Sequence, residues 1–353
     1  RAHGDAPVRL DDARLIERAD PHGVREILRA FPAQCREALA LAAEPPLTVE
    51  RPALVVVAGM GGSAAGGDLL AACAAERLDV PFLVHRGYGL PAAAGKRALV
   101  IASSYSGETA ETLSAAEAAL ARGVPVVALT AGGQLATLAA ERRIARVRLP
   151  SGLVPRMALG YLFLPAARIL AGAGLPVASE GELAEAVQVL DALAQELDPS
   201  VPASANEAKR LALAFDDRLP AIYGGPATGP VAYRWKTDLA ENAKVLAVAG
   251  TVPEMNHNEI ETWRAPGARA RHLVLLREAG EPPEIAKRFD VLRELIGPAA
   301  GGVSECWARG AARPARLLAL VYVGMWTSYY LAVARGVDPW AVPLLDEMKR
   351  RLR

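Results

Sequence analysis

The sequence predicts an α/β protein of two domains, each a mainly parallel sheet flanked by helices as an α-β-α sandwich. Short apolar runs without polar alternation recur between longer helical stretches, which is typical of parallel sheets covered on both faces. The succession of runs stops and restarts once, so two sheets are expected. The length agrees, because 353 residues, 52% of them apolar, exceed what one hydrophobic core usually organises.

Four apolar runs in the first half predict the strands of the first sheet. They cover residues 53–59, 82–86, 98–104 and 124–130, and helical stretches at 64–78 and 108–122 lie between them. A strand, a helix and a second parallel strand form the repeating unit of such a domain.

The second half begins after a charge-rich helical connection at 180–197 and a turn-forming stretch at 198–206. Its expected strands are 221–225, 245–250 and 272–278. We therefore divide the chain into a helical extension (1–50), a first domain (51–175), a helical connection (176–206) and a second domain (207–353) that closes with a helix. The extension carries apolar residues spaced for one helical face and is expected to pack against the first domain: Ile16, Val24, Ile27, Leu28 and Phe31.

Charge and cysteine content narrow the functional class. Lysine and arginine total 40 against 39 acidic residues, so no bulk charge draws the chain to nucleic acid or to a membrane surface. Cys35, Cys73 and Cys306 are too scattered for a disulfide framework, and the first residues lack the order of a signal peptide. We expect a cytoplasmic protein. The uncharged stretch 317–334 reaches the lower limit for a membrane span, but a buried helix is the expected reading.

A glycine-rich turn, GMGGSAAGGD at 59–68, follows the first expected strand. Glycine permits positive φ and close backbone approach, and the N–H groups at a helix start favour an anion. The spacing is not GxGxxG and the turn lacks the lysine of a P-loop, so neither a dinucleotide fold nor an NTPase is indicated. A tight turn without a ligand remains an alternative.

A second polar turn, SYSGETAETL at 104–113, follows another strand of the same sheet. Its hydroxyls can converge on the oxygens of one phosphate, although capping of the next helix is an alternative role. Two such turns at the carboxyl ends of strands in one sheet favour a phosphate site.

GMGGS followed about forty residues later by SYSGET resembles the sugar isomerase (SIS) domain family. The resemblance implies a sugar phosphate ligand, whose phosphate would be bound by Ser63, Ser104, Ser106 and Thr109 with help from the backbone near Gly62. Many members have Asn where this chain has Glu108, and we expect that side chain to point away from the phosphate.

The segment 241–263 carries the residues that suit proton transfer, since an isomerase needs a carboxylate base and an acid/base group. Four glutamates surround His257 there, and local spacing does not rank them: Glu241, Glu254, Glu259 and Glu261. ENAK and PEMNHNEIE resemble the bifunctional phosphoglucose/phosphomannose isomerases. That resemblance implies that Glu241 is the base and that His257 assists ring opening from the neighbouring subunit of a homodimer.

Two further positions match that family. VPRMALGYLFLP at 154–165 implies that Arg156 faces the enediolate, a suitable role for a permanently charged guanidinium. The closing segment GVDPWAVPLLDEMKRRLR implies that Lys349 is directed at the ring oxygen. Trp340 stands where members often carry Thr, a position linked to the orientation of the sugar, and this departure makes mannose activity less expected than glucose activity.

The favoured interpretation is an aldose-ketose isomerase that needs no cofactor and no metal, because no His/Cys/Asp cluster has metal-ligand spacing. It would interconvert glucose 6-phosphate, and with less certainty mannose 6-phosphate, with fructose 6-phosphate through an enediolate. One alternative is a non-catalytic SIS sensor of sugar phosphates, which would need neither Glu241 nor His257. Another is an SIS isomerase of amino-sugar phosphates.

Overall fold

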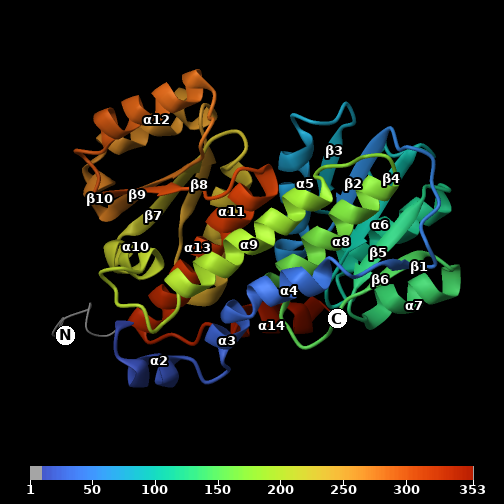
Figure 1. The fold of residues 1–353 in the computed structure, drawn as a ribbon, viewed down its shortest axis with the longest axis horizontal. Helices are drawn as coiled ribbons and strands as arrows, with labels where there is room; N and C mark the ends of the chain where they lie inside the picture. The colour runs from blue at the N-terminus through green and yellow to red at the C-terminus, as the bar shows by residue number, and fades with distance from the viewer. Residues whose placement is uncertain (1–9, 353) are drawn as a thin grey trace. The chain divides into compact units, whose positions relative to one another are not determined.

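A computed structural model describes residues 10–352 and confirms an α/β chain with two separate, parallel-rich sheets (Figure 1). The chain forms two compact units. The first unit comprises Ala30–Gln188 with Ala312–Ala315, and the second comprises the described residues up to Arg29 together with Val189–Ala311 and Arg316 onward.

The first unit contains a six-stranded sheet in the order β1-β6-β5-β4-β2-β3. All neighbours are parallel except β1 and β6, which pair antiparallel. The strands are β1 Ala43–Glu44, β2 Leu54–Ala58, β3 Phe82–His85, β4 Ala98–Ser103, β5 Val126–Thr130 and β6 Ala145–Arg148.

Alternate residues of β2 show that helices cover both faces of this sheet. Val57 faces α5 (Gly61–Ala74) so closely that a Cβ on Gly67 would lie 2.8 Å from its Cγ1. Val56 points the other way, into a core shared with α6 (Ala110–Ala121). Because successive side chains of a strand point to opposite faces, a central strand of this kind is apolar throughout.

Further helices complete the first unit. They are α4 Phe31–Ala38, α7 Gly133–Arg142, the short 3₁₀ helix η1 Pro155–Met157, α8 Leu159–Gly172 and α9 Glu180–Glu196, which continues into the second unit. Helix α8 packs against both α4 and α5. Arg156 lies on η1, directly before α8.

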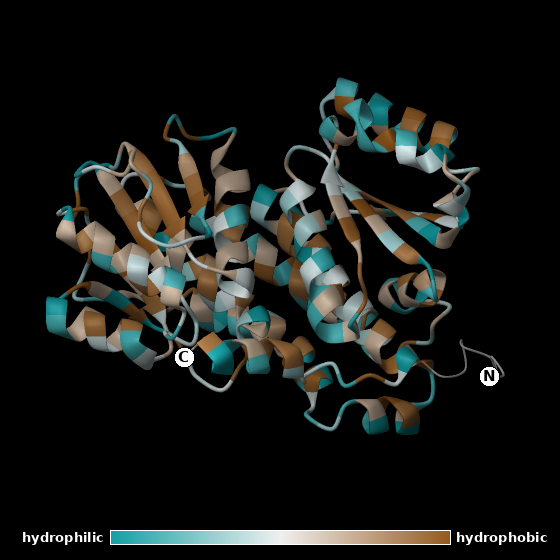
Figure 2. Ribbon diagram, turned by 180° about the vertical axis from the view of Figure 1, so that it is seen from behind, coloured by the Kyte–Doolittle hydropathy of each residue, from teal (hydrophilic) through white to brown (hydrophobic). Residues whose placement is uncertain are grey.

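The second unit contains a four-stranded, wholly parallel sheet in the order β10-β9-β7-β8. The strands are β7 Leu219–Gly224, β8 Val248–Thr251, β9 Arg271–Arg277 and β10 Gly302–Trp307. Its helical elements are α2 Ala13–Ala19, α3 Val24–Arg29, α10 Glu207–Phe215, α11 Gly229–Asp238, the π-helical turn η2 Leu239–Ala243, the 3₁₀ helices η3 Glu254–His257, η4 Glu259–Arg264 and η5 Pro266–Ala270, then α12 Pro283–Ile296, α13 Arg313–Arg335 and α14 Pro343–Leu352. Figure 2 shows apolar residues along the central strands of both sheets.

Helix α13 is long and apolar enough to cross a membrane by length and composition, but 94% of its most apolar window is buried inside the protein. Trp326, Tyr329 and Tyr330 on this helix are fully buried, and their rings pack against one another. This is the environment of a core helix in a soluble protein, as expected for 317–334.

Several elements differ from the sequence prediction. Strands β1, β6 and β10 were not expected, since β1 has only two residues and both β6 and the edge strand β10 mix polar with apolar residues. The run 245–250 enters its strand only at Val248. The amphipathic N-terminal stretch is divided into three short helices, and the break before α3 contains Gly23 at φ +69°. Val24, Leu28 and Phe31 are fully buried and Ile27 only partly.

Candidate functional site

The two polar turns predicted from the sequence meet at one place in the first sheet. β2 connects through α5 to β3 on one side, whereas β4 connects through α6 to β5 on the other. β2 and β4 are neighbours, so the crossovers diverge between their carboxyl ends. In open parallel sheets this switch point is where ligands bind. Both turns, 59–63 and 104–109, begin there.

The first turn leads directly into α5. Gly61 has φ +50°, and Ser63, 4% exposed, lies in the first turn of the helix. The Ser63 hydroxyl accepts a hydrogen bond from the Tyr105 backbone N–H at 3.2 Å. The Ser63 carbonyl accepts one from the Ser103 hydroxyl at 2.9 Å. The glycine-rich turn is therefore bonded to the second turn through Ser63.

The second turn is closed by its own hydroxyls. Ser104 Oγ lies 2.9 Å from Thr109 Oγ1 and accepts the Gly107 backbone N–H at 3.1 Å. Ser106 is exposed, and its hydroxyl accepts the Glu108 N–H at 3.3 Å. Thr109 is the N-cap residue of α6, yet its side chain makes no capping bond. The capping alternative for Thr109 is therefore not realised, and its hydroxyl stays with Ser104.

Glu108 lies beside this turn but directs its carboxylate at the start of α7. The carboxylate accepts the Gln134 backbone N–H at 3.0 Å and the Gln134 side-chain amide at 2.9 Å. An anion at a helix N-terminus is stabilised by the exposed N–H groups and the helix dipole. The carboxylate therefore ties the second turn to α7.

Tyr105 joins the two turns to a third segment and was not anticipated from the sequence. Its hydroxyl donates to the Pro150 carbonyl at 2.6 Å and accepts the Leu153 N–H at 3.1 Å. Burial raises the pKa of this phenol. The only sequence signal was a large aromatic residue between two serines, whose hydroxyl usually finds a hydrogen-bond partner when it is buried.

Arg156 stands directly against the glycine-rich turn. A Cβ on Gly62 would lie 2.7 Å from both the N and the Cα of Arg156, so only glycine allows this approach. The Arg156 side chain is 3% exposed. The first unit thus brings Gly62, Ser63, Ser104 and Thr109 together with the predicted cation.

Glu241 lies in the second unit, on the π-helical turn η2 that ends α11. Two neighbours hold this turn in place. The Asn242 side chain donates to the Ser328 hydroxyl at 2.9 Å, and Lys244, at φ +55°, donates to the Glu241 carbonyl at 2.9 Å and the Asp338 carbonyl at 2.7 Å. Single-turn π segments are frequent at functional sites. The Glu241 side chain is partly exposed.

His257 is exposed at the end of η3, in the connection that follows β8. Helix α11 runs back to the edge of the second sheet that is formed by the amino ends of its strands, where β8 begins. His257 follows β8, at the edge formed by the carboxyl ends. Glu241 and His257 of one chain therefore flank opposite edges of the same sheet. Strand β8 alone spans about 10 Å between them, at about 3.3 Å per residue.

Two of the other glutamates around His257 have structural partners. Glu259 accepts a 2.6 Å hydrogen bond from the buried hydroxyl of Tyr223, whose pKa is raised by burial and by this carboxylate. Glu254 accepts the Asn258 side-chain amide at 2.8 Å. Both carboxylates fix the connection that carries His257.

Lys349 and Trp340 belong to the C-terminal segment. Lys349 is exposed on α14, of which no described residue is buried. The Trp340 ring stacks on His22 with centroids 5.9 Å apart, and His22 Nδ1 lies 3.2 Å from an Asp338 carboxylate oxygen. The predicted residues Glu241, His257 and Lys349 thus lie in the second unit, and their meeting with the hydroxyls of the first unit stays a prediction.

The corresponding switch point of the second sheet is occupied by protein groups. After β7, Thr228 uses its hydroxyl to accept the Gly225 N–H and to donate to the Leu276 carbonyl, both at 2.8 Å. After β9, the buried guanidinium of Arg277 pairs with Glu281 at 2.8 Å. The Thr228 hydroxyl and the Arg277 guanidinium at this edge already bond to neighbouring protein groups. The phosphate site is therefore expected on the first sheet alone.

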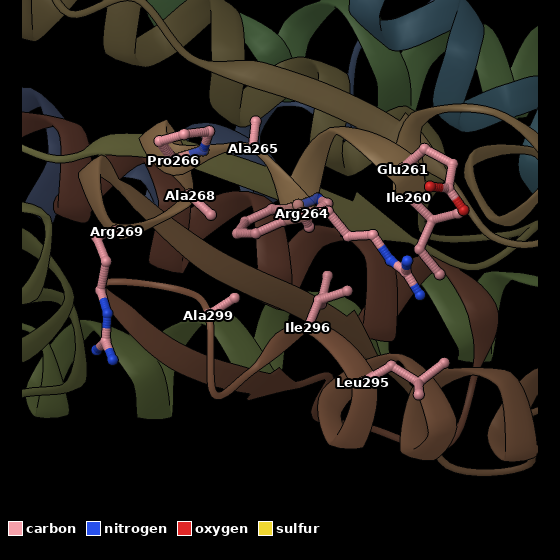
Figure 3. A pocket seen from close by; sticks show the side chains of 11 residues that line it. Ile260, Glu261, Arg264, Ala265, Pro266, Ala268, Arg269, Leu295, Ile296 and Ala299 are labelled. Atoms are coloured by element: carbon pink, nitrogen blue, oxygen red, sulfur yellow. The ribbon is translucent and has the colours of Figure 1, made fainter.

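A hollow near the His257 connection lies between η4, η5 and α12 and has a volume of about 460 Å³ (Figure 3). Its lining includes Trp263, Ile296 and Leu295. In Figure 3 the side chain of Arg269 extends away from the other side chains that carry labels. None of the predicted catalytic residues lines it. Within residues 10–352, no group of three or more His, Cys, Asp or Glu side chains is arranged to hold a metal ion.

Two parallel α/β sheets, with a glycine-rich and a hydroxyl-rich turn at the switch point of the first, define a two-domain SIS protein. Residues 52–163 match the model of the SIS domain family, and residues 204–352 match the family described as bacterial phospho-glucose isomerase C-terminal SIS domain. The chain belongs to the bifunctional phosphoglucose/phosphomannose isomerase family.

Relatives in that family cover most of the chain. A bifunctional phosphoglucose/phosphomannose isomerase of Caldicellulosiruptor bescii is 39% identical over 305 residues, which are 84% of this chain and 89% of that protein. The enzyme of the same name from Thermoplasma acidophilum is 33% identical with the same coverage. Among solved structures, a glucose-6-phosphate isomerase like protein from Thermus thermophilus is similar in fold, with a TM-score of 0.61 and 24% identity over 97% of this chain and 98% of that one.

Proposed function

We propose that this protein is an isomerase that interconverts glucose 6-phosphate and mannose 6-phosphate with fructose 6-phosphate. The observation that carries the proposal is the bonded pair of turns at the β2/β4 switch point, with Arg156 against them, in a chain whose family carries this name. Hydroxyls and helix-start N–H groups suit a phosphate dianion. The substrate phosphate would contact Ser63, Ser104, Ser106, Thr109 and the backbone at Gly62.

The reaction moves one proton between adjacent carbons of the open-chain sugar. Glu241 takes the proton from C2 of the aldose, which leaves an enediolate with its charge on O1. A proton then passes from the O2 hydroxyl to O1, and Glu241 returns its proton to C1 to give the ketose. The Arg156 guanidinium stabilises the negative oxygen of this intermediate without a metal. His257 and Lys349 act at the ring oxygen when the cyclic sugar opens. We propose the bounds 51–175 and 207–353 for the two SIS domains that supply these residues.

We propose further that the active protein is a homodimer in which His257 acts on the partner's substrate. The support is topological, since Glu241 and His257 flank opposite edges of the same sheet. A site that uses both groups would take them from two chains. Three buried cysteines that form no disulfide support placement of this dimer in the cytoplasm.

The reaction is tested by incubating the protein with fructose 6-phosphate in the presence of a chelator and separating the products by chromatography. Glucose and mannose 6-phosphates are expected, and their formation with chelator present supports the metal-free mechanism. Glu241→Gln should lower kcat at least about 100-fold, in the range for loss of a general base. Glu261→Gln, an exposed carboxylate of the same segment, is the matched control and should keep full activity.

A sensor would bind fructose 6-phosphate without converting it, and an isomerase of amino-sugar phosphates would act only on the amino sugar. Either result would replace the proposed reaction. Activity lost with chelator would instead remove the metal-free mechanism.

The dimer is tested by mixing two inactive variants, Glu241→Gln and His257→Ala, after dissociation and reassociation. Half of the dimers would then be mixed and one of their two sites intact, so roughly a quarter of wild-type activity should return if the site is shared. A mixture that stays inactive while ultracentrifugation shows mixed dimers would place both groups in one chain's site.

A further inference from the structure

We propose that Gln34, on the N-terminal helix α4, is a positioning residue for Arg156, so that part of the N-terminal extension belongs to the machinery of the reaction. The inference rests on the proposed role of Arg156 at the enediolate. It concerns residues of the first unit only, and it adds a function to a segment that the sequence assigns to packing.

Both polar atoms of the Gln34 side chain are engaged by the segment that carries Arg156. Gln34 is 7% exposed. Its Nε2 donates to the Met157 carbonyl at 2.9 Å, and its Oε1 accepts the Gly160 N–H at 2.9 Å. A Cβ on Gly160 would lie 2.8 Å from that same Oε1, so the glycine makes room for the amide.

These bonds supply a helix cap that the local sequence lacks. Ala158 is the N-cap residue of α8 and has no side-chain acceptor, which leaves the first N–H groups of the helix without a local partner. Gln34 satisfies the Gly160 N–H from a different helix. Loss of the amide would leave two buried backbone groups unpaired, so the junction between η1 and α8 would shift to recover partners.

Arg156 is held from the other side by the phosphate turns. Its N and Cα lie against Gly62, and Tyr105 binds the carbonyl of Pro150 and the N–H of Leu153 just before it. The Arg156 backbone is thus fixed between the two turns and Gln34. Movement at the Gln34 side alone would change the distance between the guanidinium and the phosphate turns.

Helix α4 is a firm support for this purpose. Phe31 and Cys35 on α4 are fully buried. Tyr161, in the first turn of α8, donates to the Glu37 carboxylate at 2.6 Å, and Arg168 donates to the Leu39 carbonyl. Hydrogen bonds therefore join α4 to α8 at both ends of their contact. Those made by Gln34 are the ones next to Arg156.

The test is a double-mutant cycle on fructose 6-phosphate turnover. Gln34→Met keeps the volume and removes both hydrogen bonds. We expect kcat to fall about ten-fold or more with KM within about two-fold, because a displacement near 1 Å can cost up to about 100-fold while ground-state phosphate contacts remain. In an Arg156→Ala background the same substitution should change kcat less than about two-fold.

Controls separate positioning from stability. Val124→Ala, in the core of the same unit, should lower the unfolding midpoint and leave kcat unchanged. Gln34→Asn keeps the amide but is one methylene too short to reach both partners, so it should give a smaller drop in kcat and serves if Gln34→Met does not fold.

The outcomes are distinct. Equal losses in kcat in both backgrounds would show that Gln34 acts independently of Arg156, and a rise in KM alone would place its effect on binding. Either result overturns the inference and leaves the proposed function intact. Full activity of Arg156→Ala would remove the enediolate role of Arg156, and the positioning role of Gln34 with it.

Discussion

A Cβ on Gly107 would lie 1.8 Å from the carbonyl oxygen of Gly132, so the turn 104–109 and the turn before α7 pack backbone to backbone. The Gly132 carbonyl is itself fixed by the Thr130 hydroxyl at 2.8 Å. Gly107 also has φ +71°, a conformation that disfavours any other residue. Two independent constraints therefore require glycine at this position.

We expect Gly107→Ala to displace the turn and to raise KM for fructose 6-phosphate by about ten-fold or more, since a clash with backbone cannot be relieved by a side-chain rotation. Gly123→Ala is the matched control, because Gly123 has φ +66° but only the Lys96 side chain within 4 Å of a new Cβ. It should cost about 1–2 kcal/mol of stability and leave KM unchanged. Equal KM for both variants would contradict the role of the close contact.

Ser104 and Thr109 should act as one unit in phosphate binding, because their hydroxyls lie 2.9 Å apart. We expect Ser104→Ala and Thr109→Val each to raise KM by about ten-fold, and the double variant to raise it by less than the product of the two. Ser114→Ala is the control, because it removes a hydroxyl from α6, the helix that begins after Thr109, and this hydroxyl bonds to the Gly89 N–H. It should leave KM unchanged. Additive effects in steady-state kinetics would argue against a shared ligand oxygen.

His272 should make the fold sensitive to mild acid. It is 3% exposed beside Phe215, and burial, aided by Arg218, lowers its pKa from 6.5 to about 4. The unfolded chain therefore binds the proton first, so the stability contribution is full above pH 6.5 and is lost as pH falls toward 4. The loss amounts to about 3 kcal/mol, at about 1.4 kcal/mol per pKa unit.

The check is urea unfolding of wild type and His272→Gln at pH 7.5 and pH 4.5. The variant keeps a polar partner for the Ser304 hydroxyl, which lies 2.8 Å from His272 Nε2. Its loss of unfolding free energy between the two pH values should be smaller than that of wild type by about 2 kcal/mol. The same loss in both proteins would show that other groups cause the acid sensitivity.

Trp340→Thr should increase the share of mannose 6-phosphate among the products formed from fructose 6-phosphate. The reason is the resemblance that links this position to sugar orientation, together with the stacking of the Trp340 ring on His22. His22→Ala, which removes the stacking partner but keeps the indole, is the control. An unchanged product ratio in Trp340→Thr would separate this residue from sugar selection.

Some strands of the fold could be predicted from the sequence, whereas others, and the contacts around Tyr105 and Gln34, could not. The strands β2, β4 and β5 were predictable because both of their faces are covered, so nearly every residue is apolar. Strand β6 was missed because ARVR is short and alternates polar with apolar residues. The bond from Tyr105 to Pro150 and Leu153 and the cap from Gln34 to Gly160 join residues 45 to 126 positions apart. Local patterns carry no information on such pairs.

The sequence by itself determined that two polar turns follow strands of one parallel sheet and that an arginine, a glutamate and a histidine stand in motifs that resemble those of one enzyme family. Periodicity and turn chemistry are local, so they survive in the linear chain. Only the tertiary structure decided that β2 and β4 are neighbours, that Gly62 touches the Arg156 backbone and that Glu241 and His257 flank opposite edges of a sheet. Those relationships depend on the order in which the strands pair, and that order is set by packing between distant segments.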